Sequence, residues 1–179
     1  MKFTESRLAG AFLIELDPVW DERGFFAPSW SREEFTRRGL DAEFSECAIS
    51  FNLRRGTLRG LHHQVAPFEE TKLVRCTAGA IYDVIVDLRP DSPTRRQWAA
   101  FELSAENRHL LYVPRGFAHG FQTLVDATEV FYQLTGAYSP GHARAIRWDD
   151  AGLGISWPAT PERIMSVRDR GISTEEHQP

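Results

Sequence analysis

The residues most able to do chemistry in this chain are concentrated in one short stretch, GTLRGLHHQ at positions 56–64. It places Arg59, His62 and His63 between glycines and apolar residues. Successive side chains of an extended strand point to opposite faces, so at most one of the two histidines faces the interior. Arg59 lies opposite to His62 in an unbroken strand, but a bulge at Gly60 would bring it to the same side.

A histidine that faces a polar interior is a candidate general base, because imidazole has an unperturbed pKa of about 6.5. Arg59, His119 and Lys72 offer groups that bind a phosphate or an oxygen that gains negative charge. Lys72 is one of only two lysines among 21 basic residues. Tyr132 and Tyr138 share a face if their strand is regular, and each could donate a proton, stack on a base or simply pack in the core.

A second motif, PxGxxH ending at His119, resembles the second motif of the cupin barrels, in which a hairpin aims the histidine inward. Metal-binding cupins combine it with an earlier HxH pair and a glutamate. Here His62 and His63 are adjacent, so two ligands from one face are missing even if Glu69 and Glu70 contribute. We therefore predict that the protein uses no metal.

The whole chain of 179 residues, 42% hydrophobic and 26% charged, suits one globular domain spanning residues 1–179. A net charge of −4 gives no reason to expect nucleic acid as a partner. No apolar run approaches the roughly 20 residues of a membrane span, and the first residues lack the apolar core of a signal peptide. Cys47 and Cys76 have no CxxC partner, which favours a cytoplasmic location. The polar segment 171–179 is expected to be frayed.

Short segments rich in β-branched and aromatic residues alternate with turn sequences about every ten residues, which predicts an antiparallel sandwich or barrel. One short helix is expected after Ser31, which forms a capping box with Glu34, and Gly39 ends it. The expected strands are 11–16, 24–30, 72–79, 80–88, 98–104, 109–114, 117–124 and 128–136, and 58–64 is extended.

The segment 80–88 carries two carboxylates, and alternation places Asp83 and Asp87 on one face together with isoleucines. That face fits the lumen of a barrel with a polar site. It fits equally well the solvated face of an edge strand. The sequence leaves both open.

Several long motifs together resemble the dTDP-4-dehydrorhamnose 3,5-epimerase family, over about residues 12–170. The resemblance implies an all-β, cupin-type double-stranded β-helix (jelly roll) with a few short helices, usually a homodimer. It implies an enzyme without metal or cofactor that removes protons beside the C4 ketone of a nucleotide-diphospho-4-keto-6-deoxy sugar and returns them to the other face, in deoxysugar biosynthesis. The motifs are DERGFF (21–26), GTLRGLHHQ, KLVRCTAGAIYDVIVDLRPDSPT (72–94), LSAENRHLLYVPRGFAHGFQTL (103–124), Tyr138 followed by SP, and IRWDDAGLGISWP (146–158).

Transferred residue by residue, the resemblance assigns His62 as general base and Tyr132 as proton donor. Asp169 matches the carboxylate that orients the base, and Lys72 matches the residue beside the keto oxygen. The matching substrate-binding residues are Arg23, Arg59 and His119 for the diphosphate or sugar, and Tyr138 for stacking on the base. Phe26 is a further substrate-binding candidate, as an aromatic residue that could reshape the base pocket.

Four departures from the family's pattern concern the outer, nucleotide-binding positions. Pro28 and Ala143 replace glutamates, Gln133 replaces a lysine, and the segment 46–49 reads ECAI in place of a QDN-like sequence. The sequence therefore leaves open which base is bound and whether C3, C5 or both are inverted.

Two other functions compete with epimerisation. A nucleotide-sugar 3,4-ketoisomerase would use similar acid–base groups to move the carbonyl. A non-catalytic or metal-dependent sugar-binding cupin is the other alternative, but pure binding requires neither the acid Tyr132 nor the orienting carboxylate Asp169.

Overall fold

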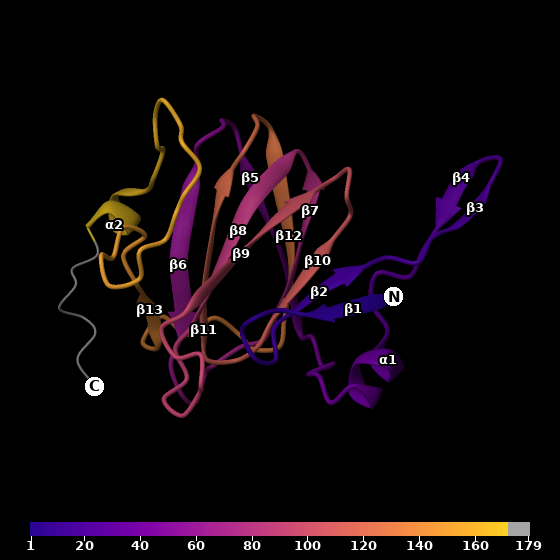
Figure 1. Ribbon diagram of the computed structural model, residues 1–179, viewed down its shortest axis with the longest axis horizontal. Coiled ribbons are helices and arrows are strands. Elements are labelled where there is room, and N and C mark those ends of the chain that lie inside the picture. The colour runs from indigo at the N-terminus through magenta and orange to yellow at the C-terminus, as the bar shows by residue number, and fades with distance from the viewer. Residues whose placement is uncertain (172–179) are drawn as a thin grey trace.

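The computed structural model describes residues 1–171, which form two antiparallel sheets and a separate hairpin (Figure 1). The helices are α1 (Arg32–Arg37) and α2 (Val167–Arg170). The strands are β1 (Lys2–Glu5), β2 (Phe12–Glu15), β3 (Val19–Asp21), β4 (Gly24–Phe26), β5 (Glu46–Asn52), β6 (Leu58–Gln64), β7 (Lys72–Ala78), β8 (Ala80–Asp87), β9 (Trp98–Ser104), β10 (Leu110–Val113), β11 (Phe117–Thr123), β12 (Thr128–Leu134) and β13 (Ala143–Ala145).

The six-stranded sheet has the order β1-β2-β10-β7-β12-β5, and the five-stranded sheet has the order β13-β6-β11-β8-β9. Buried apolar side chains of both sheets meet in one core, with Val74 and Val130 from the first and Ile81, Ile85 and Phe121 from the second. Alternate residues of each strand supply this core, as the period of a strand requires. The predicted class, an all-β cupin-type jelly roll with a few short helices, is confirmed.

Strand β8 lies between β11 and β9, so the edge-strand alternative is wrong. Asp83 is fully buried on the face that carries Ile81 and Ile85, toward the space between the sheets. The other face of β8 is buried as well, because residues of the segment 146–157 pack on it. Asp87 does not reach the lumen. Its carboxylate binds the side chains of the turn that follows, at Arg89, Ser92 and Thr94.

Helix α1 begins and ends where its caps predict. The Ser31 hydroxyl accepts a hydrogen bond from the backbone N–H of Glu34 at 3.4 Å, and Gly39 adopts a φ of +71° after the last turn. Strand β4 ends at Phe26, earlier than expected, just before Pro28, whose nitrogen carries no hydrogen for a ladder bond. Of the segment expected to be frayed, only Gly171 lies within the described residues, where it caps α2. No helix of residues 1–171 is long and apolar enough to cross a membrane.

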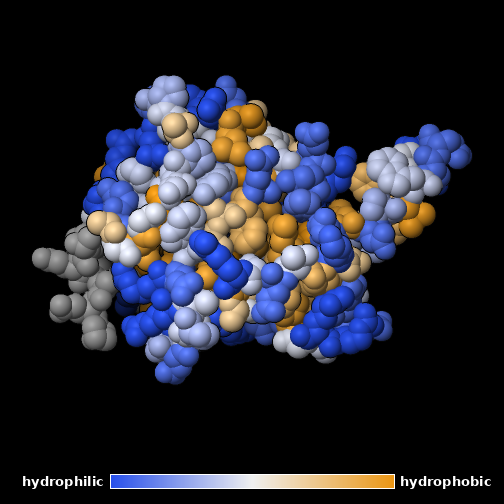
Figure 2. Space-filling model, in the orientation of Figure 1, coloured by the Kyte–Doolittle hydropathy of each residue, from blue (hydrophilic) through white to orange (hydrophobic). Residues whose placement is uncertain are grey.

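The hairpin β3–β4 extends away from the two sheets (Figure 1). The Arg108 guanidinium lies 4.8 Å from the centre of the Phe25 ring, in the middle of β4. The neighbouring apolar side chains face solvent, and Trp20 and Phe26 are 65% and 74% exposed. Figure 2 shows orange, hydrophobic residues on the projecting arm beside pale and blue ones. Such exposure on a short arm is typical of a segment that binds another surface.

Candidate active site

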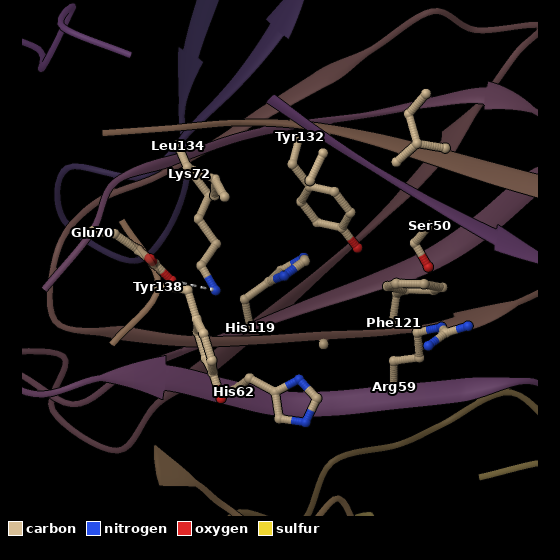
Figure 3. A pocket seen from close by; sticks show the side chains of 13 residues that line it. Ser50, Arg59, His62, Glu70, Lys72, His119, Phe121, Tyr132, Leu134 and Tyr138 are labelled. Atoms are coloured by element: carbon tan, nitrogen blue, oxygen red, sulfur yellow. Dashed lines mark ion pairs between the residues drawn. The ribbon is translucent and has the colours of Figure 1, made fainter. Parts of the chain in front are cut away.

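A cavity of about 330 Å³ opens between the two sheets and brings together most of the residues singled out from the sequence (Figure 3). The five-stranded sheet contributes residues of β6 and β11, and the six-stranded sheet contributes residues of β5, β7 and β12. The lining includes Ala48, Ile49, Ser50, Arg59, His62, Glu70, Lys72, His119, Phe121, Tyr132, Leu134 and Tyr138.

A bulge in β6 decides which side chains of GTLRGLHHQ enter the cavity. His62 pairs with His119 and Arg59 pairs with Phe121, so β6 has one residue more than β11 between these pairs. Gly60 makes the close approach possible, because a Cβ there would lie 2.5 Å from the Cα of Gly120, and its φ is +128°. In agreement with strand alternation, one of the two adjacent histidines lines the cavity: His62 does and His63 does not. The bulge that Gly60 permits brings Arg59 to the side of His62.

His62 is bound by a carboxylate from a distant part of the chain. Its Nε2 lies 2.7 Å from Oδ1 of Asp169, which is almost fully buried in α2. The Ser166 hydroxyl caps this short helix by accepting from the backbone N–H of Asp169 at 3.0 Å. Burial opposes ionisation of Asp169, but the hydrogen bond and charge of His62 together with Ser166 outweigh it and hold the pKa of Asp169 below its usual value. An ionised carboxylate therefore orients the imidazole.

The segment before α2 is fixed against β6 by backbone hydrogen bonds. Leu58 N–H donates to the carbonyl of Ile164 at 2.8 Å, and Ile164 N–H donates to the carbonyl of Gly56 at 2.9 Å. After this short parallel contact the chain forms α2 beside β6 (Figure 1), and Asp169 of α2 meets His62.

A second histidine–carboxylate pair lies deeper in the cavity. Nε2 of His119 lies 2.9 Å from both carboxylate oxygens of Asp83. Asp83 is wholly buried, and this burial raises the pKa of its carboxyl despite the opposing influence of His119 and Lys72. The His119 ring meets Tyr132 edge to face, with the ring centres 6.0 Å apart.

Tyr132 enters the cavity from β12, opposite to His62. Burial, followed by the negative charge of Asp83, raises the pKa of its phenol well above the usual value, although the charge of Arg59 opposes this shift. The hydroxyl therefore stays protonated and is available as a donor. Tyr138 follows β12 in a loop, and its ring is 59% exposed at the mouth of the cavity.

Lys72 begins β7 and is nearly buried, with Nζ 3.2 Å from Oε1 of Glu70. The sequence indicates Glu70 only as a possible metal ligand, and its contact with Lys72 depends on the fold. Ser50 and Leu134 were not predicted to line the cavity either, whereas Ala48 and Ile49 belong to the segment 46–49 that matches nucleotide-binding positions. These residues lie on β5 and β12, and the sequence does not predict which strands these two pair with.

Two of the expected substrate-binding residues do not reach this cavity. Arg23 and Phe26 lie on the hairpin β3–β4, where the Arg23 guanidinium binds the carboxylate of Asp21 in the same turn. Phe26 faces solvent. Within one chain, Arg23 and Phe26 therefore lie apart from the other seven predicted site residues, which are in or beside the cavity.

With this geometry in place, comparison with known proteins decides the family. The family model described as dTDP-4-dehydrorhamnose 3,5-epimerase matches residues 5–176. The chain belongs to this family. The predicted resemblance is thus confirmed, and the chain is an isomerase, so the non-catalytic alternative no longer applies.

Relatives of this epimerase family cover nearly the whole chain. The dTDP-4-dehydrorhamnose 3,5-epimerase of Sinorhizobium fredii is 41% identical over 169 residues, which are 94% of this chain and 87% of that protein. The crystal structure of the Bacillus anthracis enzyme with TDP and PPi bound is 44% identical, with a TM-score of 0.91 over 96% of this chain and 98% of its own. The Legionella pneumophila dTDP-6-deoxy-D-glucose-3,5-epimerase in complex with dTDP-4-keto-L-rhamnose is 34% identical, with a TM-score of 0.89, covering 96% and 90%.

Proposed function

We propose that this epimerase acts on a nucleotide-diphospho-4-keto-6-deoxyhexose and inverts C3, C5 or both by proton transfer beside the C4 ketone. One observation carries the proposal: His62 and Tyr132 extend into the cavity from opposite sheets (Figure 3). A sugar ring bound between them meets a base on one face and an acid on the other. This is the arrangement that inversion at a carbon requires.

Lys72 supplies the charge that makes the proton removable. A hydrogen beside a ketone is too weak an acid for an imidazole to remove alone, so the oxygen of the enolate must be stabilised. An ammonium group held in a nearly buried position by Glu70 performs this task. Asp169 stabilises the imidazolium that forms when His62 takes the proton.

Arg59, His119 and Tyr138 hold the rest of the substrate in this proposal. Arg59 is fixed by Asn52, whose Oδ1 accepts from Nε at 2.8 Å, and its remaining N–H groups suit a diphosphate. Tyr138 presents an exposed ring face for stacking on the base. Ala48 and Ile49 line the cavity at two of the positions that depart from the family's pattern, and their side chains cannot hydrogen-bond a base.

The experiment that tests this proposal measures deuterium incorporation into the sugar as well as the product that forms. The protein is incubated in deuterated water with dTDP-, CDP- and GDP-linked 4-keto-6-deoxy sugars, and NMR follows deuterium at C3 and C5. We expect deuterium incorporation with inversion and the ketone still at C4, first with the dTDP sugar because the relatives carry that name. A product with its ketone at C3 would establish a 3,4-ketoisomerase instead.

We also propose that the protein is a homodimer and that Arg23 and Phe26 serve the cavity of the second copy. Two features support this. The hairpin β3–β4 extends from the sheets with apolar side chains exposed. Strand β5, at the edge of the six-stranded sheet, exposes Ile49 and Phe51, and Leu53 after its end is exposed as well, which makes an apolar surface suited to a second chain.

Mixing two defective variants tests this exchange. Arg23→Ala impairs the hairpin and His62→Ala impairs the cavity, so each variant alone is expected to be poorly active. If the hairpin crosses to its partner, a mixed dimer contains one intact site, and an equal mixture regains about a quarter of wild-type activity. Activity no higher than the sum of the two variants, or a monomer by ultracentrifugation, would contradict the proposal.

Chelation is expected to leave activity unchanged. Both cavity histidines are engaged by carboxylates of their own, at Asp169 and Asp83. After incubation with EDTA and gel filtration, the rate of epimerisation should match that of the untreated protein, and elemental analysis should find less than one metal ion per chain. Stoichiometric zinc, iron or manganese together with loss of activity on chelation would instead indicate a metal-dependent cupin.

We further propose a cytoplasmic location, supported by two free thiols, of which Cys47 is exposed. Fractionation of cells that express the protein would test it.

A further inference from the structure

Gln64, the last residue of β6, lies outside the acid–base chemistry described above, yet its side chain makes several specific contacts. It is 5% exposed. Its Oε1 accepts from the backbone N–H of Ser139 at 2.6 Å. Its Nε2 lies 3.2 Å from the carbonyl of Ala137, 3.1 Å from the carbonyl of Phe68 and 2.7 Å from Oε2 of Glu70. One amide thus connects β6 with two separate loops.

The first of these loops carries Tyr138. Gln64 binds the carbonyl immediately before this tyrosine and the N–H immediately after it. Because β12 ends at Leu134, no strand fixes the backbone at Tyr138. The exposed ring can form a rigid stacking surface only if this backbone is held in place. The amide of Gln64 holds it on both sides.

The second loop carries the partner of Lys72. Gln64 binds one carboxylate oxygen of Glu70, and the other oxygen lies 3.2 Å from Nζ of Lys72 (Figure 3). A carboxylate fixed at one oxygen presents the other in a defined direction. The orientation of Glu70, and with it the position of the ammonium group, therefore depends on the Gln64 amide.

We propose that Gln64 is a positioning residue that aligns two ends of the active site at once: the stacking ring of Tyr138 and, through Glu70, the ammonium group of Lys72. This inference deepens the proposed function and rests on it for the roles of Tyr138 and Lys72. A glutamine suits the position because it offers an acceptor to Ser139 and donors to Glu70 and Ala137 at the same time.

The variant Gln64→Glu keeps the size and the acceptor but replaces the donor by a carboxylate that faces Glu70. Near pH 8 the two like charges repel, and both loops lose their common anchor. We expect the Kd for dTDP, measured by calorimetry, to rise about tenfold, and deuterium exchange at C3 and C5 to slow by a similar factor.

Acidification separates a positioning role from a packing role. Two carboxyl groups at hydrogen-bond distance share a proton at a pH where an isolated one is ionised, and the protonated group donates as the amide did. Near pH 5.5 the dTDP affinity of Gln64→Glu should recover to within about threefold of wild type at that pH. Gln64→Met, of similar length but without a donor, should bind dTDP weakly at both pH values. Melting curves establish that all three proteins are folded.

Hydrogen exchange of the free protein gives a second readout that needs no ligand. Amides of the segment 135–142 should exchange faster in Gln64→Met than in wild type, because Ser139 loses its acceptor. Wild-type dTDP affinity at both pH values in both variants, or unchanged exchange of 135–142 in Gln64→Met, would overturn the inference. Wild-type protein that neither binds dTDP nor labels any 4-keto sugar would instead overturn the proposed function, and the exchange of 135–142 would still decide whether Gln64 holds the loop.

Discussion

Replacement of His62 by alanine is expected to stop deuterium exchange at C3 and C5 while the substrate still binds. Loss of a general base costs about 10²–10⁴ in rate, and the neighbouring Asp169 cannot take its place because its carboxylate is almost fully buried behind the imidazole. The contacts made by Arg59 and Tyr138 are retained, so affinity should change by less than about tenfold. Label followed by NMR and dTDP binding followed by calorimetry measure the two effects separately.

His63→Ala is the matched control, because the adjacent side chain of the same strand does not line the cavity. It should retain most of the activity of the wild-type protein. Exchange that persists in His62→Ala would place the base elsewhere, and loss of exchange in His63→Ala would identify the neighbouring histidine as that base.

The part of the site that could be predicted from the sequence is the part set by local geometry. Alternation along a strand separates His62 from His63, and a glycine at position 60 permits the bulge that turns Arg59 inward. Alternation also places Asp83 on the same face of β8 as Ile81 and Ile85, although only the structure shows that this face is the inner one. Each of these conclusions needs only the neighbouring residues, because backbone periodicity acts over a few positions.

Pairings between distant segments could not be derived in this way. Nothing in the residues around His119 states that β11 lies beside β8, so its contact with Asp83 required the structure. Only the family resemblance, and no local pattern, indicates Asp169 as the carboxylate that orients His62. The pattern Ser166-x-x-Asp169 does indicate a short helix start, and α2 begins there, but the capping pattern does not say which strand the helix lies beside.

Strand β5 and the hairpin β3–β4 also have features that the sequence does not predict. The sequence ECAISFN of β5 mixes polar and apolar residues without a regular period, because the strand lies at a sheet edge with one face on the cavity and the other exposed. Phe26 lies on the expected strand 24–30, which in the structure ends at that residue, and Arg23 directly precedes the strand. Their distance from the cavity depends on how far the arm extends. That is a property of the whole fold.

The roles of the two tyrosines predict different outcomes for the same chemical change. Tyr132→Phe keeps the ring against His119 but removes the hydroxyl, so proton removal by His62 should continue while the opposite face receives no proton. Substrate labelled with deuterium but not inverted should accumulate, and the rate of inversion should fall by about 10²–10⁴. Burial, followed by the charge of Asp83, raises the pKa of Tyr132, so its hydroxyl holds the proton that this transfer requires.

Tyr138→Phe should leave inversion nearly unchanged, because stacking uses the ring face and not the hydroxyl. Tyr138→Ala removes the ring, and we expect it to weaken nucleotide binding by about 1–3 kcal/mol, as for other aromatic–base contacts. NMR of the sugar protons distinguishes labelled substrate from inverted product, and calorimetry with dTDP measures the binding loss. If Tyr138→Phe blocked inversion and Tyr132→Phe did not, the donor would be the tyrosine at the mouth of the cavity. The proton would then reach the ring from the loop that follows β12 and not from the strand facing His62.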